Sequence, residues 1–163
     1  MDAKAAIKET LSLSNMVLSS YISDLTDAEL MKRPAAGCNH VAWQLGHLIS
    51  SECGMLNGIQ PGAAPELPEG FDEKHSKENA TSDDSSDFLT KEQYTELAGK
   101  VHDAVTACLD AYPSEKLDDP SPEAYRSMFP TMGSIFLLIA THPMMHAGQL
   151  VPLRRQLGKP VVI

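Results

Sequence analysis

The sequence predicts an all-α protein built on four long helices. Apolar residues recur at helical spacing in four separate segments, and the only short strand-like stretch is Val161 to Ile163 at the C-terminus. Two long connections rich in Pro, Gly, Asp and Ser separate the last three of these segments. The chain of 163 residues has the length of one domain, so we expect a single four-helix bundle over residues 1–163.

Composition and charge exclude several classes of protein. Hydrophobic residues at 42% and charged residues at 21% are typical of an ordinary globular protein. The net charge of −9 has the same sign as nucleic acid and anionic membrane surfaces, so we expect neither as a partner. The longest apolar run, Ile135 to Ala140, is too short to cross a bilayer. Three cysteines without a C-x-x-C pair, and an N-terminus without a signal-peptide pattern, predict a cytoplasmic protein.

The first two long helices are predicted at residues 2–24 and 39–56. Each has an apolar stripe at helical spacing. Between them, Thr26 and Glu29 form a capping-box pattern that predicts a short helical turn. The second helix is expected to begin with Asn39 as its N-cap.

The connection from Asn57 to Leu89 is unusually long for neighbouring helices of an up-and-down bundle. It predicts either a crossover that joins two parallel helices or a lid. Its acidic run is typical of a solvated loop. The third helix is then expected over residues 90–112, beginning with the capping box of Thr90 and Gln93.

The fourth helix is the most apolar. Its core-facing stripe recurs at helical spacing and comprises Ile135, Leu138, Ile139, His142, His146, Gln149, Leu150, Leu153 and Leu157. Pro143 lies inside this pattern and predicts a kink or bulge near residues 139–143, because proline removes one helical hydrogen bond. Pro152 predicts a second irregularity, and Gly158 with Pro160 ends the helix.

His142 and His146 suggest a metal site. They lie four residues apart on the core-facing side, so both imidazoles can point at one atom. Two adjacent buried imidazoles need hydrogen-bond partners and repel each other when both are protonated, and a shared cation satisfies both requirements. The alternative is a pair of hydrogen-bonded core histidines. A metal held by two nitrogens alone would be under-coordinated, so a third ligand is required.

Four other histidines are candidates for the third ligand. His75 falls in the long connection, and His102 lies beside the apolar stripe of the third helix, where we expect it to be exposed. His40 and His47 lie two turns apart on a polar face of the second helix, together with Gln44. Reasoning from the residues leaves the choice between His40 and His47 open.

Two segments make the chain resemble the DinB/YfiT-like superfamily of four-helix-bundle proteins, many of which are regarded as metalloenzymes. They are HVAWQLGHLISSE at residues 40–52 and THPMMHAGQLVPLRRQLGKP at residues 141–160, and the helix and loop lengths agree over nearly the whole chain. The resemblance implies an up-down-down-up bundle, in which residues 57–89 form the long crossover between helices 2 and 3.

The resemblance also implies a ligand set of His47, His142 and His146 for a divalent metal. Many members carry a further histidine and an arginine around the last ligand, in the pattern H-x-x-H-H-R-G-Q. This chain has Met145 and Ala147 there, so it lacks those two polar side chains while it keeps the three ligands.

Three neutral imidazoles leave coordination positions open, which is typical of a reactive site, and zinc or nickel suits three nitrogens. Such a metal lowers the pKa of a bound water or thiol. Similar proteins include thiol-dependent S-transferases and isomerases, so the resemblance favours activation of a low-molecular-weight thiol that reacts with a small-molecule substrate. The alternatives are a metal-dependent hydrolase and a non-catalytic helical bundle that binds a ligand or partner. A homodimer is also expected by resemblance.

The sequence provides no convincing general base beside the three ligands. Glu52 is poorly phased with His47 on the second helix, and Gln149 cannot accept a proton. The candidates for lining the pocket or supporting the ligands are His40, Trp43, Gln44 and Gln149.

Overall fold

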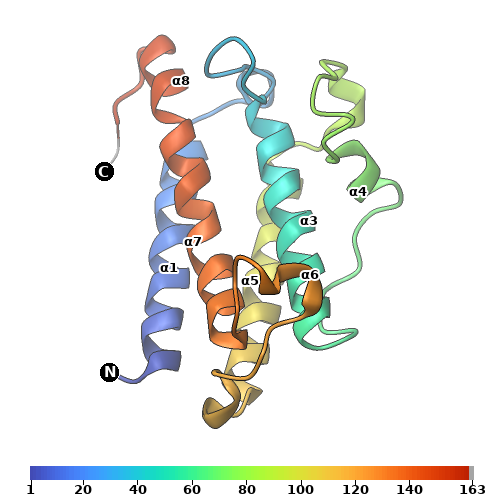
Figure 1. Ribbon diagram of the computed structural model, residues 1–163. Helices are drawn as coiled ribbons and strands as arrows, with labels where there is room; N and C mark the ends of the chain where they lie inside the picture. Colours follow the sequence, from blue (N-terminus) through green and yellow to red (C-terminus); the bar gives the residue numbers. More distant parts are fainter. Residues whose placement is uncertain (162–163) are drawn as a thin grey trace.

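Four long helices lie side by side in the computed structural model, which describes residues 1–161 (Figure 1). They are α1 (Ala3–Ile22), α3 (Val41–Ile59), α5 (Lys91–Ala111) and α7 (Met132–Gln149). Within the described residues no strand is formed, apart from one isolated bridge between Pro120 and Thr131. The all-α prediction is confirmed. Val162 and Ile163 of the strand-like stretch lie outside the described residues.

Short helices and turns connect the long ones. They are α2 (Asp27–Leu30), α4 (Phe71–Lys74), α6 (Glu123–Arg126), α8 (Val151–Gln156) and the 3-10 turns Ser85–Asp87 and Ser114–Lys116. No helix in the described part of the chain is long and apolar enough to span a membrane.

Side chains at the helix starts explain where the helices begin. The capping boxes predicted at Thr26 and Thr90 are both formed. The prediction of Asn39 as the N-cap of α3 is wrong, because His40 occupies that position. Its Nδ1 accepts the Trp43 backbone N–H at 3.0 Å, so its Nε2 carries the proton and donates to the Ser82 carbonyl at 3.1 Å.

The fourth predicted helix is two helices. α7 continues through Pro143 without a break and ends at Gln149, and α8 follows from Val151. The break therefore falls beside Pro152, in the first turn of α8, and not at residues 139–143. Proline is tolerated in a first helical turn, where its missing N–H would have no intrahelical partner.

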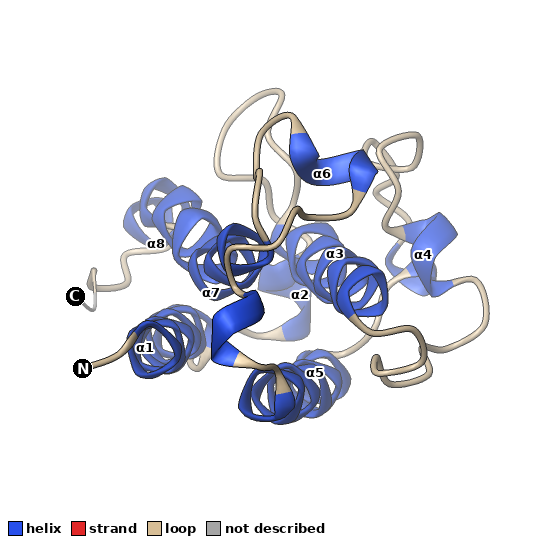
Figure 2. Cartoon of the chain, turned by 60° about the horizontal axis from the view of Figure 1, so that its bottom comes forward, coloured by secondary structure: helices blue, strands red, loops and turns tan. Residues whose placement is uncertain are grey.

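The helices pack unevenly around the core. α1 lies along α7, and α3 packs against both α5 and α7, whereas α1 and α5 touch only sparingly (Figure 2). Leu11, Leu56, Val101, Ile135 and Ile139 are almost completely buried between these helices. The α1–α5 side is therefore the least closed side of the bundle.

The connection over residues 57–89 is more ordered than a solvated loop. Its acidic residues at 83–84 are exposed, as predicted, but Phe71 and His75 are buried against α3. The His75 ring occupies the space where a Cβ at Gly46 would lie, so glycine permits this close approach. The indole N–H of Trp43 also donates to the Ser76 carbonyl at 3.0 Å. These contacts hold the connection along the α3 helix.

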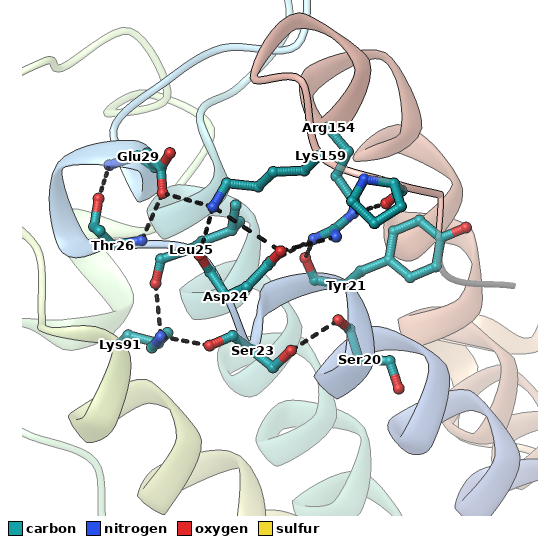
Figure 3. Close-up of polar contacts among 11 residues, drawn as sticks. Ser20, Tyr21, Ser23, Asp24, Leu25, Thr26, Glu29, Lys91, Arg154 and Lys159 are labelled. Atoms are coloured by element: carbon teal, nitrogen blue, oxygen red, sulfur yellow. Dashed lines mark hydrogen bonds and ion pairs between the residues drawn. The ribbon is translucent and has the colours of Figure 1, made fainter.

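A polar network joins the C-terminal segment to the end of α1 (Figure 3). The buried guanidinium of Arg154 donates to the Tyr21 carbonyl at 2.6 Å, to Asp24 Oδ1 at 2.7 Å and to the Pro160 carbonyl at 2.7 Å. The Arg154 hydrogen bond lowers the pKa of the Asp24 carboxyl. No pattern in the sequence pointed to this arginine as a core residue.

Candidate metal centre

Three histidines converge where α3 packs against α7. His47 comes from α3, and His142 and His146 lie one turn apart on α7; we call these three residues the histidine triad. Their ring centroids are 5.5 Å (47–142), 5.6 Å (47–146) and 5.0 Å (142–146) apart. One nitrogen from each ring lies within 4.8 Å of the other two. Small side-chain rotations therefore allow all three to reach one ion at bond lengths of about 2.0–2.1 Å.

The triad is neutral at physiological pH. Burial, followed by the charge of neighbouring histidines, lowers the pKa of both His142 and His146 to about 4. Burial and the positive charge of Lys77 lower the pKa of His47. A neutral imidazole has one unprotonated nitrogen with a lone pair, which is the form that binds a metal.

Gln44 fixes the orientation and the tautomer of His146. The Gln44 amide Nε2 donates to the Asn39 carbonyl at 2.8 Å, so its Oε1 faces Nδ1 of His146 at 3.0 Å. Nδ1 of His146 therefore carries the proton, and its Nε2 is free to bind a metal. Metal-binding histidines commonly donate their other N–H to such an oxygen.

His142 provides an independent indication of a ligand. Its Nδ1 is buried and has no hydrogen-bond partner among the described residues. Buried polar atoms nearly always have a partner, which can be a ligand or an ordered solvent molecule. Together with three neutral nitrogen donors, this unpaired atom fits a divalent metal cation.

Of the other predicted site residues, Trp43 contacts the triad, whereas His40 and Gln149 do not take part in it. The Trp43 indole stacks on the His47 ring, with centroids 4.9 Å apart and an interplanar angle of 6°, and so limits its rotation. His40 is buried at the start of α3 with both ring nitrogens engaged, away from the triad. Gln149 is exposed at the end of α7. Of the two histidines left open by the sequence, His47 is the one brought to the pair on α7.

His75 has a structural role that the sequence analysis missed. Its Nδ1 donates to the Phe71 carbonyl at 2.8 Å, and its Nε2 accepts the Tyr94 hydroxyl proton at 2.7 Å. This buried pair fastens the long connection between α3 and α5. The signal available in the sequence was Gly46, a glycine inside a helix, which often marks a close approach of another group.

The triad can be reached from solvent. His47 and His142 are partly exposed, and His146 is buried behind them. Lys77, on the long connection, is exposed and lies close enough to lower the pKa of His47. The ammonium of Lys77 is therefore the exposed cation that acts on His47.

The fold and the triad together define a helical-bundle protein with a three-histidine cluster that can hold a metal ion. The family model of the DinB superfamily matches residues 10–150, and the chain belongs to this superfamily. A crystal structure of a conserved protein from Enterococcus faecalis shares the fold, with a TM-score of 0.70 and 18% sequence identity over 98% of this chain and 99% of that one. No curated protein matches the chain significantly.

Proposed function

We propose that the protein is a metal-dependent enzyme in which His47, His142 and His146 hold one divalent ion, either zinc or nickel. The observation that carries this proposal is the meeting of three neutral imidazoles around one point, with His142 Nδ1 left without a partner. Gln44 and Trp43 support it further, because they hold two of the three rings in position.

The reaction we favour is transfer of a low-molecular-weight thiol to a small-molecule electrophile: the thiol loses its proton to solvent, and its sulfur forms a C–S bond while a leaving group such as halide departs. A divalent ion in such a site lowers the pKa of a thiol or water molecule, and so supplies a nucleophile near neutral pH. The charges that act on the three imidazoles are those of one another and of Lys77. A lysine attracts an anionic thiolate, and its ammonium cannot accept a proton.

Metal-dependent hydrolysis is the second candidate reaction, and a base that takes a proton from water would assist it. The buried carboxyl of Glu52 is the acid of α3 closest in sequence to His47. Five residues at about 100° each place it about 140° around the helix axis from His47. Within α3, no carboxyl group is therefore placed to assist hydrolysis beside His47.

We further infer an up-down-down-up course for α1, α3, α5 and α7, with residues 57–89 as the crossover. The colours in Figure 1 support this inference, since α3 and α5 both begin at the upper end of the view.

We also propose a cytoplasmic setting, supported by the three unpaired cysteines Cys38, Cys53 and Cys108. A homodimer remains a proposal, to be tested by sedimentation.

The test compares wild type, His142→Ala and His102→Ala. His102 is a matched control because it is a histidine outside the triad, next to Asn15. We expect wild type and His102→Ala to join glutathione or free cysteine to an aryl halide, and His142→Ala to lose both this activity and the metal. Hydrolysis of a nitrophenyl ester without any thiol dependence would favour the hydrolase. Wild-type protein without metal or activity would instead favour a bundle that only binds a ligand or partner.

A further inference from the structure

A cavity of about 390 Å³ opens between α1 and α5, which make few contacts with each other. Core residues from three helices form its apolar wall: Leu18, Ile22, Leu45, Leu48, Ile49 and Pro143. None of the three triad histidines lines it. The volume is in the range of small-molecule sites, and the position is separate from the candidate metal centre.

Glu52 lines this cavity and has no hydrogen-bond or ion-pair partner among the described residues. Glu52 is only 7% exposed. Its carboxyl group makes no hydrogen bond or ion pair with any residue from 1 to 161. Burying a carboxyl group without a partner is costly. Burial raises the pKa of Glu52 to about 8, so the group is mostly protonated at neutral pH in the free protein.

Two carboxyl groups, those of Glu52 and Asp103, line the cavity together with the imidazole of His102 and the phenol of Tyr94. Within the described part of the chain, no lysine or arginine lines it. Hydroxyl and amide groups from α1 and α5, those of Ser12, Asn15, Ser19 and Thr95, add hydrogen-bonding capacity. The protein as a whole has a net charge of −9. An anion would be repelled from this cavity, and a neutral apolar molecule would leave Glu52 without a partner.

We propose that the cavity binds a small organic cation, a protonated amine on a compact apolar body, with Glu52 as its counter-ion. The ammonium group donates to the carboxylate, and the apolar body packs against the leucine and isoleucine wall. A paired charge then replaces an unpaired buried acid, which makes binding favourable. This binding site goes beyond the proposed metal-dependent function and does not depend on it.

The first test uses benzylamine and benzyl alcohol, which share a ring but differ in charge. Calorimetry at pH 7 compares both probes on wild type and on Glu52→Gln, an isosteric change that removes only the acid. We expect benzylamine to bind wild type at least tenfold more tightly than benzyl alcohol, and Glu52→Gln to remove this preference. Equal binding of the two probes by wild type, or an unchanged preference in the variant, would overturn the proposal.

Proton release gives a readout that a merely structural Glu52 would not produce. Because the pKa of Glu52 is raised to about 8, a bound ammonium should displace its proton at pH 7. Calorimetry in buffers with different heats of ionisation should therefore report about one proton released per benzylamine bound by wild type. The Glu52→Gln variant should release none, and wild type binding benzylamine without proton release would contradict the assignment.

The location is tested by filling the cavity. A Cβ at Gly99, which lines the cavity, would meet nothing within 4 Å, so Gly99→Leu places a side chain in open space. Gly148→Leu is the matched control, since Gly148 on α7 is equally open and lies outside the cavity lining. We expect only Gly99→Leu to weaken benzylamine binding, by tenfold or more. Equal effects of the two variants would place the amine elsewhere and overturn the proposal.

Discussion

Replacing Gln44 with leucine should weaken metal binding although Gln44 is not a ligand. The change removes the oxygen that accepts the Nδ1–H of His146 at 3.0 Å. The buried N–H is then unpaired, which costs about 1–3 kcal/mol. A metal bound to Nε2 of His146 makes its Nδ1–H a stronger hydrogen-bond donor. Losing the acceptor therefore destabilises the metal-bound protein more than the metal-free protein. Loss of such supporting groups lowers metal affinity about 10–100-fold, or about 1.4–2.7 kcal/mol.

Competition with a chromophoric zinc chelator at pH 7.5 measures this loss. Gln149→Leu provides the matched control, because it makes the same chemical change at an exposed position at the end of α7. We expect its affinity to stay within about twofold of wild type. Circular dichroism checks that Gln44→Leu remains folded, since the Asn39 carbonyl also loses its donor. A folded Gln44→Leu protein with wild-type affinity would refute the role of Gln44 in holding His146.

Three further predictions concern stability. Metal-free protein should lose stability as the pH falls from 6.5 towards 4. In this range the unfolded chain binds protons at His142 and His146, whereas the folded protein, in which the pKa of both is about 4, does not. Urea titrations across this pH range measure the loss. Gly46→Ala should cost about 1–3 kcal/mol in thermal melts, because the new methyl group overlaps the His75 ring. Gly99→Ala is the matched change in open space and should gain about 0.5–1 kcal/mol. Arg154→Met should cost about 1–3 kcal/mol at pH 7 in urea titrations, because the Tyr21 and Pro160 carbonyls lose their donor. The difference from wild type should shrink as the pH falls below 3.8, because the pKa of Asp24 is lowered in the folded protein and its pairing with Arg154 is lost on protonation.

The sequence predicted the helices well where local signals were strong. The capping boxes at Thr26 and Thr90 set helix starts that the structure confirms, because each involves residues only three positions apart. The predicted N-cap of α3, Asn39, was wrong because the N-cap residue here makes contacts with a segment distant in the sequence. His40 serves as the cap since its second nitrogen reaches Ser82, forty-two residues away.

The candidate site depended on long-range packing in the same way. Helical spacing alone identified the pair His142 and His146, but His40 and His47 share one face of α3 and could not be separated. In the structure, the packing of α3 on α7 brings His47 to the pair and leaves His40 at the helix start. The cavity around Glu52 was not foreseen, because it exists only where α1 and α5 fail to pack closely.

Elemental analysis of wild type and His47→Ala, purified side by side without chelator, tests the central claim most directly. His47 is the ligand contributed by a different helix from the other two, so the site requires the bundle to bring them together. We predict one zinc or nickel ion per wild-type chain and its loss in a folded His47→Ala variant. Metal that persists undiminished in His47→Ala, or is absent from wild type, would contradict the three-histidine site.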